Sequence, residues 1–166
     1  MKIKVVVLTK FFPVVICIHL VDFSSVQAQS SDQNYVRTRS PRTKISSEFT
    51  LNSLSPNPDS VGTTIQYFDG LGRPIQTVSL KASPGFNDIV QPIVYDAFGR
   101  EQFKYLPYIN SVNDGSYKVN ALQGVASFYS NPPSGIQNTT HPFSETRFEP
   151  SPLNRVLEQG SPGTDW

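Results

Sequence analysis

The chain has 166 residues, of which 14 are Lys or Arg and 13 are Asp or Glu, giving a net charge of +1. A chain so close to neutral has no general attraction for nucleic acid or for an anionic membrane. Its length suits one small domain or a piece of a larger protein, and its 14 Pro and 10 Gly indicate many turns and short elements.

The amino terminus has the pattern of an export signal. Residues 1–10 contain three lysines and no acid, an apolar stretch follows over residues 11–21, and Ala28 ends a short polar segment. A basic start, a short apolar run and a small residue before the cut are typical of a signal peptide. We therefore predict a signal peptide over residues 1–28 and a secreted, periplasmic or cell-surface protein with no integral membrane span after processing.

Removal of this segment also removes Cys17, the only cysteine of the chain. Disulfides, thiolate catalysis and cysteine-ligated zinc are then excluded. His141 is the one histidine left, in the loop-like context Thr-Thr-His-Pro. Because metal sites need several convergent ligands, we interpret it as a solvated loop residue and expect no metal or other cofactor.

Residues 29–60 are rich in Ser, Asn and Pro, and we interpret them as a polar, partly disordered leader. The segment Tyr35–Lys44 carries four basic residues that could contact phosphates. Asp32 and Glu48 flank this run and dilute its charge, so no nucleic-acid partner is expected. A short strand near Ser47–Leu51 is the alternative to a leader without secondary structure.

Residues 61–108 predict two β-hairpins. β-branched and aromatic residues over 63–68 and 74–80 are typical of strands, and Asp69–Gly72 between them has turn chemistry. The pattern returns with strands over 89–95 and 100–105 around a turn at Asp96–Gly99.

Both turns carry the same motif, which reads aromatic, Asp, two variable residues, Gly, Arg. A weaker third copy near the carboxyl end has Asn in place of Gly, and Asn is the residue that next best tolerates a left-handed backbone. We treat residues 148–166 as a degenerate and truncated third repeat. The motif residues are Tyr67, Phe68, Asp69, Gly72 and Arg73 in the first copy, Tyr95, Asp96, Gly99 and Arg100 in the second, and Phe148, Asn154 and Arg155 in the third.

Each motif position has a structural interpretation. The Asp can accept backbone N–H bonds within its turn. The Gly can take a positive φ that would cost another residue about 1–2 kcal/mol. The Arg can bond an acid or a carbonyl on a neighbouring hairpin. A pair that recurs at fixed spacing serves every copy alike, whereas catalysis needs one assembled site, so we interpret the motif as structural.

Between the second and third copies, residues 109–147 predict a loop-rich insert with one short helix. Asn120 would cap this helix, with Gln123 reaching back in a capping box. Its apolar face would be formed by Ala121, Val125 and Phe128. The fold class is therefore mainly β, built from antiparallel hairpins with one short helix and long loops. Because a lone hairpin is marginal in water, the copies should share a sheet.

The segments Tyr67–Pro74 and Tyr95–Arg100 resemble the tyrosine–aspartate (YD) repeats of the Rhs family. Phe148–Trp166 is similar to the end of the amino-terminal domain that precedes these repeats in secreted bacterial Rhs-type proteins. The resemblance implies a β-sheet strip that spirals into a hollow shell, which often encloses a variable segment, commonly a toxin, or presents an adhesive surface. It also implies further YD repeats, of the same or an adjacent chain, as partners, and no catalytic role for this domain.

The leading hypothesis is thus a non-enzymatic structural module at the front of an exported Rhs/YD-repeat shell or surface protein. The alternative is a stand-alone secreted module that binds a cell-surface glycan or protein by stacking on exposed rings, for which the candidates are Tyr67, Tyr105, Tyr108, Phe128 and Tyr129. A third reading is a hydrolase with a carboxylate pair. Its candidates are Asp69, Asp96, Glu145, Glu149 and Glu158.

Overall fold

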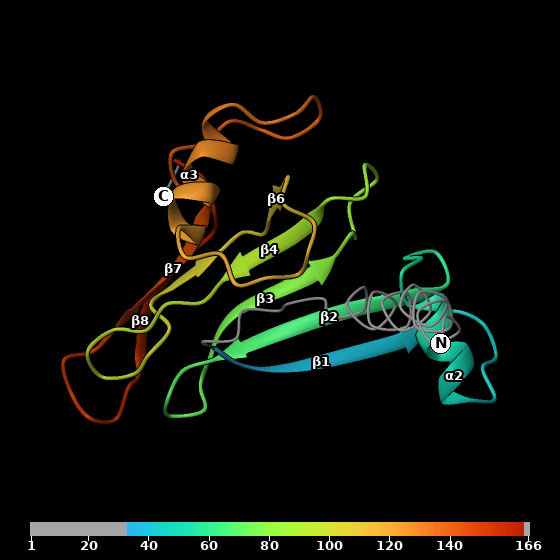
Figure 1. Ribbon diagram of the computed structural model, residues 1–166. Coiled ribbons are helices and arrows are strands. Elements are labelled where there is room, and N and C mark those ends of the chain that lie inside the picture. The colour runs from blue at the N-terminus through green and yellow to red at the C-terminus, as the bar shows by residue number, and fades with distance from the viewer. Residues whose placement is uncertain (1–32, 165–166) are drawn as a thin grey trace, which may run out of the picture.

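The computed structural model describes residues 33–164, so the predicted signal peptide lies outside the described residues. The fold is mainly β, with all strand pairs antiparallel, as the sequence predicts (Figure 1). The elements are β1 (Asn34–Pro41), α2 (Glu48–Leu54), β2 (Val61–Phe68), β3 (Pro74–Leu80), β4 (Asp88–Pro92), β5 (Phe103–Tyr105), β6 (Tyr108–Asn110), α3 (Ala121–Ser130), β7 (Phe143–Phe148) and β8 (Val156–Gly160).

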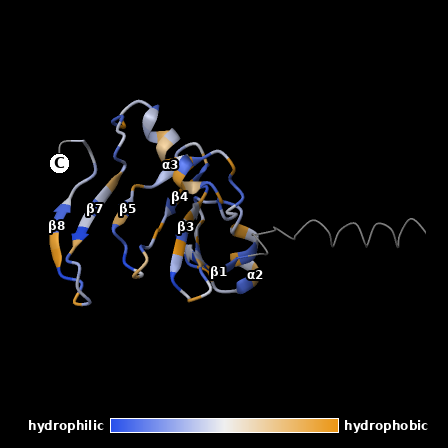
Figure 2. Cartoon of the chain, turned by 90° about the vertical axis from the view of Figure 1, so that its left-hand side faces the viewer, coloured by the Kyte–Doolittle hydropathy of each residue, from blue (hydrophilic) through white to orange (hydrophobic). Residues whose placement is uncertain are grey.

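The strands form two sheets. One has five strands in the order β1-β2-β3-β4-β6, and the other has three in the order β5-β7-β8. Figure 2 shows β1 and α2 at one end of the molecule and β8 at the other. The first predicted hairpin is confirmed as β2–β3, and the third copy of the motif joins β7 to β8.

The described part of the predicted leader contains strand β1 and helix α2, which the sequence analysis did not predict. β1 pairs with β2 along its whole length, from Asn34 opposite Phe68 to Pro41 opposite Val61. A strand depends on its partner for order, and local composition does not reveal that partner. The proposed strand near 47–51 is wrong, because Ser47 caps helix α2 by accepting a hydrogen bond from the backbone N–H of Thr50 (3.2 Å).

The two strands of the second predicted hairpin belong to different sheets. β4 belongs to the five-stranded sheet and β5 to the three-stranded one, and an isolated bridge between Ile93 and Lys104 joins the two arms. Beyond this bridge the returning chain continues as β6, which pairs with β4 with Tyr108 opposite Val90, while β5 pairs with β7. The repeat therefore spans the junction of the two sheets.

Helix α3 confirms the short helix predicted in the insert, although its start differs. Asn120 precedes it without a capping bond from its side chain, so the predicted capping box is wrong. The buried face consists of Ala121, Val125 and Tyr129, while Phe128 is partly buried beside it. The third hairpin begins earlier than predicted, because β7 starts at Phe143.

The hydrophobic core lies between the five-stranded sheet and α3. Its fully buried strand residues include Ile65, Val78 and Val90, each with 0% of its surface exposed. Tyr108 on β6 is 4% exposed and lies directly under α3. This packing fixes the position of the strands that carry the repeated turns.

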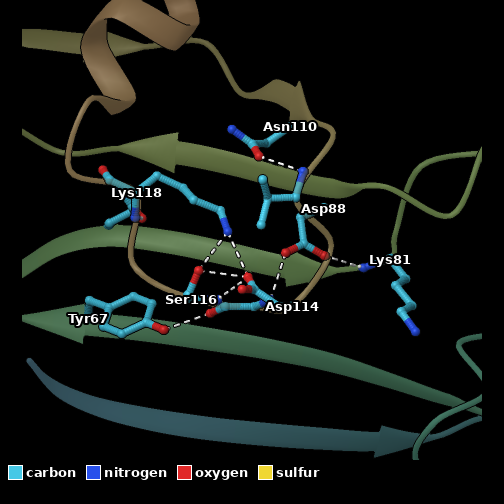
Figure 3. Close-up of polar contacts among 10 residues, drawn as sticks. Tyr67, Lys81, Asp88, Asn110, Asp114, Ser116 and Lys118 are labelled. Atoms are coloured by element: carbon cyan, nitrogen blue, oxygen red, sulfur yellow. Dashed lines mark hydrogen bonds and ion pairs between the residues drawn. The ribbon is translucent and has the colours of Figure 1, made fainter. Parts of the chain in front are cut away.

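Residues 111–119, here called the strap, cross the same face of the sheet (Figure 3). Three buried side chains hold it. The Tyr67 hydroxyl donates to the carbonyl of Gly115 (2.6 Å), and the amide of Gln76 bonds both backbone groups of Lys118 (2.8 and 3.0 Å). The Asp88 carboxylate accepts from the backbone N–H groups of Lys81 and Gly115, both at 2.8 Å. These buried polar groups are paired, which is what a structural role requires.

The strap also closes on itself. The Lys118 ammonium donates to Asp114 and to the Ser116 hydroxyl, both at 2.8 Å (Figure 3). Partial burial opposes ionisation of Asp114, but the hydrogen bonds from Lys118 and Ser116 outweigh it and lower the pKa of Asp114 to about 2.

Candidate functional site

The three copies of the motif form what we call the acid–arginine turns: Asp69–Arg73, Asp96–Arg100 and Glu149–Arg155. In each turn the backbone N–H of the acid donates to the carbonyl of the arginine, at 2.9 Å in all three. The three segments are therefore closed by the same bond, although the last is two residues longer than the others. This shared geometry confirms that the third copy is a true structural equivalent of the first two.

The first two turns make the same set of hydrogen bonds. In the first, Oδ1 of Asp69 accepts from the backbone N–H groups of Leu71 (2.9 Å) and Arg73 (2.8 Å), while Oδ2 accepts from Nε of Arg73 (2.8 Å). In the second, Asp96 makes the same three bonds at 2.9, 2.9 and 2.8 Å. The prediction that the Asp serves its own turn is confirmed.

The third turn reaches the same arrangement with a longer acid. Glu149 accepts from Nε of Arg155 at 2.9 and 3.0 Å, and the Ser151 hydroxyl donates to it at 2.6 Å. Glutamate has one methylene more than aspartate, which lets its carboxylate span the longer turn. The sequence analysis left Glu149 out of the motif, although its place directly after the aromatic Phe148 is the signal that identifies it.

The predicted left-handed positions are confirmed. Gly72 and Gly99 have φ values of 77° and 76°, and Asn154 has a φ of 53°. A side chain at such a φ is disfavoured for most residues, and Asn is among the few that tolerate it.

The acids of the turns are held in their charged form. The backbone N–H of Arg73 is the largest influence that lowers the pKa of Asp69, and that of Arg100 does the same for the pKa of Asp96. The side-chain hydrogen bond from Arg155 is the main cause that lowers the pKa of Glu149. A stabilised carboxylate suits a fixed turn and is a poor proton donor at neutral pH.

The arginines were expected to bond an acid or a carbonyl on a neighbouring hairpin. Arg100 does so through the side-chain carbonyl of Asn154, but the acid that each arginine bonds is that of its own turn. All three pair with the acid of their own turn, and Arg73 and Arg100 also stack on the aromatic residue of the following copy. Cζ of Arg73 lies 4.6 Å from the ring centroid of Tyr95, and Cζ of Arg100 lies 4.8 Å from that of Phe148. The planar guanidinium can do both at once, because its edge donates hydrogen bonds while its face meets the ring.

Each stacked arginine also reaches the left-handed residue of the next turn. A Cβ atom at Gly99 would lie 3.0 Å from Nη1 of Arg73, and Nη1 of Arg100 donates to Oδ1 of Asn154 at 3.3 Å. The hydroxyl of Tyr95 returns a hydrogen bond to the carbonyl of Pro74 (2.9 Å). Successive turns are thus linked from copy to copy, the first to the second along the five-stranded sheet and the second to the third along the three-stranded sheet.

The strand register explains why each arginine meets the next aromatic residue. Gln76 pairs with Pro92, and continuing that antiparallel register by three residues places Arg73 opposite Tyr95. In the second sheet Phe103 pairs with Glu145, and the same three-residue step places Arg100 opposite Phe148. The relation between neighbouring copies is therefore the same in both sheets.

The last arginine has no ring stacked on it among residues 33–164. Its side chain is 71% exposed, compared with 38% for Arg73 and 20% for Arg100. Strand β8, which follows it, is the edge of its sheet, and its Val156 and Leu157 are 55% and 63% exposed. The ladder of turns thus ends in an open edge with an uncovered guanidinium.

The opposite edge of the fold has a different character. β1 carries Arg37 and Arg39 and ends in Pro41, which has no backbone N–H to donate. Arg39 is tied down by hydrogen bonds to Asn52 and Ser55 around helix α2. Charges and proline are features that protect an edge strand from pairing with another chain. The edge at β1 therefore carries more of these features than the edge at β8, whose one charged residue, Glu158, is paired with Arg147 of β7.

The aromatic residues proposed for glycan stacking are largely enclosed. Tyr67, Tyr108 and Tyr129 are 0%, 4% and 8% exposed, and Tyr105 and Phe128 pack against the core. The exposed apolar side chains of the repeats are instead at the turn tips. They are Leu71, Phe98 and Leu153.

The carboxylates considered for hydrolysis are divided between two settings. Asp69, Asp96 and Glu149 are each paired with the arginine of their own turn. Glu145 and Glu158 line an open hollow of about 400 Å³ along β7 and β8. Glu158 is ion-paired with Arg147 on the surface, and both side chains are about two-thirds exposed, at 65% and 64%.

Neither a metal cluster nor a membrane helix is seen within residues 33–164. No group of three or more His, Cys, Asp or Glu side chains is placed to hold a metal ion there, and no helix there is long and apolar enough to cross a membrane. His141 is an exposed loop residue, as predicted, with Nδ1 3.0 Å from the hydroxyl of Thr140.

The sequence analysis missed the residues that anchor the strap. Gln76 and Asp88 are 1% and 0% exposed, yet they belong to strands whose pattern predicts only half-buried polar positions. Their partners, Gly115 and Lys118, are more than 25 residues away in the chain. A local sequence pattern cannot predict a hydrogen bond between residues so far apart in the chain.

Comparison with known proteins gives a family and no function. Residues 37–166 match the family described as a domain of unknown function, DUF6443. No curated protein and no solved structure matches the chain. The match spans most of the chain and includes all three acid–arginine turns, so the protein belongs to the DUF6443 family.

Proposed function

We propose that this protein is a non-enzymatic structural module at the front of an exported Rhs/YD-repeat protein, where it starts a β-sheet that later repeats extend. The observation that carries the proposal is the ladder of turns. Arg73 stacks on the aromatic residue of the second copy and Arg100 on that of the third. Among residues 33–164, no ring covers Arg155 and no strand pairs with the outer edge of β8.

The difference between the two sheet edges supports a direction of growth. β1 presents arginines and a proline, and helix α2 is tied to its end. β8 presents the exposed Val156 and Leu157, has no proline, and its one charged residue, Glu158, is paired with Arg147 of β7. An unprotected strand edge is a template for another strand, so the module accepts further repeats at β8 and stops them at β1.

The state of the carboxylates supports a structural role over a hydrolytic one. A general acid at neutral pH needs a raised pKa, which enzymes obtain by burying the group. The pKa values of Asp69, Asp96 and Glu149 are shifted downward instead. The glycan-binding alternative depends on exposed rings, but Tyr67, Tyr108 and Tyr129 are buried and could not stack on a sugar.

The size of the native product tests this proposal. An antibody raised against residues 61–108 would be used on immunoblots of cells and of medium. We expect a band far larger than the 18.4 kDa of this sequence, with an amino terminus processed before Gln29. A single band just below 18.4 kDa would contradict the role as the front of a longer sheet and would favour a stand-alone module.

The direction of growth can be tested separately on this chain alone. An open β8 edge should make it self-associate, which sedimentation velocity measures as a function of concentration. Leu157→Lys places a charge on that edge and should weaken the association. The matched control is Val36→Lys, which makes a similar change at an exposed position of β1. Equal effects of the two variants would show that β8 is not the growing edge.

A further inference from the structure

We propose that Arg155 and the free edge of β8 form a receptor for an aromatic side chain, tyrosine in preference to phenylalanine, carried by a strand that pairs antiparallel with β8. The inference rests on the proposed role of β8 as the growing edge. It goes further by naming the chemistry of the partner and the position of its recognised residue.

The receptor is defined by comparison with the two arginines that are already occupied. Arg73, Arg100 and Arg155 are each held by an acid of their own turn through Nε. This bond fixes the plane of the guanidinium and leaves its face free to meet a ring. In the first two turns a ring covers that face, and in the third the side chain is 71% exposed.

The strand register gives the position of the incoming ring. In both occupied cases the aromatic residue lies opposite the arginine, three residues beyond a backbone pair of the two adjacent strands. That pair is Gln76 with Pro92 in the first case and Phe103 with Glu145 in the second. Applied to β8, the same step places one residue of the new strand opposite Glu158 and the aromatic residue three positions later opposite Arg155. A partner with its ring at another position would pair with the edge without covering the guanidinium.

Tyrosine fits the receptor better than phenylalanine. The hydroxyl of Tyr95 donates to the carbonyl of Pro74, the residue that directly follows Arg73 (2.9 Å). The equivalent acceptor in the third turn is the carbonyl of Val156. Phe148, which has no hydroxyl, makes only the ring contact with Arg100. A tyrosine would therefore gain one hydrogen bond in addition to the stacking.

The probe for the test is a synthetic peptide with the sequence of residues 88–100 of this chain, which already contains a strand and a motif aromatic residue, Tyr95. Two further peptides carry Phe or Leu at that position. Each is titrated into the ¹⁵N-labelled chain to millimolar concentration, and amide shifts of β8 report binding. We expect the Leu peptide to bind at least about threefold more weakly than the Tyr peptide, with the Phe peptide between them.

Variants of the chain identify the residue responsible. Arg155→Ala should abolish the difference between the Tyr and Leu peptides, and Arg155→Lys, which keeps the charge without the planar face, should reduce it. Arg147→Ala is the matched control, since it removes a neighbouring surface arginine that is paired with Glu158, and it should preserve the difference. The amide spectrum shows directly that each variant is folded.

The outcomes separate this inference from the proposed function. If the Tyr and Leu peptides bind β8 equally well, the aromatic receptor is wrong while the edge still accepts a strand. If no peptide shifts the amides of β8 at millimolar concentration, both the receptor and the growing edge are wrong. If the difference survives in Arg155→Ala, another residue recognises the ring and the assignment to Arg155 fails.

Discussion

Arg73 lies with its guanidinium carbon 4.6 Å from the ring centroid of Tyr95, 22 positions later in the chain and in the next copy of the same motif. The contact joins one turn to the following turn. It does not join the two strands of a single hairpin. Its repetition by Arg100 and Phe148, in the second sheet, shows that the motif encodes the relation between copies as well as each turn.

The stacking of Arg73 on Tyr95 should be measurable as a coupling free energy. We expect a double-mutant cycle of Arg73→Ala and Tyr95→Leu, followed by urea unfolding, to give a coupling of about 0.5–1 kcal/mol. The cycle cancels the hydrogen bonds that each residue makes elsewhere. The control cycle combines Arg155→Ala with Tyr95→Leu, two residues in turns that do not contact each other, and should give no coupling. A zero value for the first cycle would show that the stacking contributes nothing.

The two left-handed glycines should differ in their tolerance of a side chain. Gly72→Ala and Gly99→Ala should each cost about 1–2 kcal/mol in the free energy of unfolding, because both positions have a positive φ. Gly99→Ala should cost more, since its Cβ would lie 3.0 Å from Nη1 of Arg73, whereas nothing lies within 4 Å of a Cβ at Gly72.

An Arg73→Ala background provides the control for this comparison. Removing the guanidinium removes the crowding at Gly99, so in that background the two substitutions should have the same cost. Denaturant unfolding of the four variants measures the difference. Equal costs for Gly72→Ala and Gly99→Ala in the parent chain would mean that the Arg73 side chain moves away from position 99 without a loss of stability.

The sequence analysis predicted the parts of the fold that depend on local chemistry. The turn at Asp69–Gly72, the positive φ of Gly99 and Asn154, and helix α3 all follow from residues that are neighbours in the chain. The mainly β, antiparallel class followed from the alternation of β-branched and aromatic residues in the segments around those turns.

The parts that could not be predicted depend on distant partners. β1 becomes a strand because β2 pairs with it, and β5 joins the second sheet because it pairs with β7, which lies beyond the insert. The stacking of each arginine on the next aromatic residue needs the register between strands of different copies. Most residues of the turns could be identified from the sequence, with the exception of Glu149, but their mutual contacts are a property of the assembled sheets.

Gly124 should resist substitution although it lies within helix α3. Alanine is normally favoured over glycine in a helix by about 1 kcal/mol. Here a Cβ would lie 2.5 Å from the ring of Tyr108, which is only 4% exposed and has no free space to move into. We therefore expect Gly124→Ala to lower the melting temperature. Ser127→Ala, on the exposed side of the same helix, should leave it unchanged or raise it, and a stable Gly124→Ala variant would contradict the close packing of α3 on β6.

Acid should weaken the fold through the carboxylates of the turns. The folded-state pKa values of Asp69, Asp96 and Glu149 lie below their ordinary values of 3.8, 3.8 and 4.5. A lowered pKa means that the stabilisation is fully present above the ordinary value and is lost as the pH falls through the folded value. We expect the free energy of unfolding to decline as the pH falls below about 4.5, with Asp114 extending the loss to about pH 2.

The variant that isolates this effect is Asp69→Asn combined with Asp96→Asn. Asparagine keeps an oxygen that can accept the backbone hydrogen bonds of each turn but does not titrate, so the variant should be less stable at pH 7 and should lose less of its remaining stability on acidification. Urea unfolding at a series of pH values between 7 and 2 measures both quantities. If the variant and the parent lose stability in parallel, the acid sensitivity arises from groups other than these two turns, and their carboxylates are not preferentially ionised by folding.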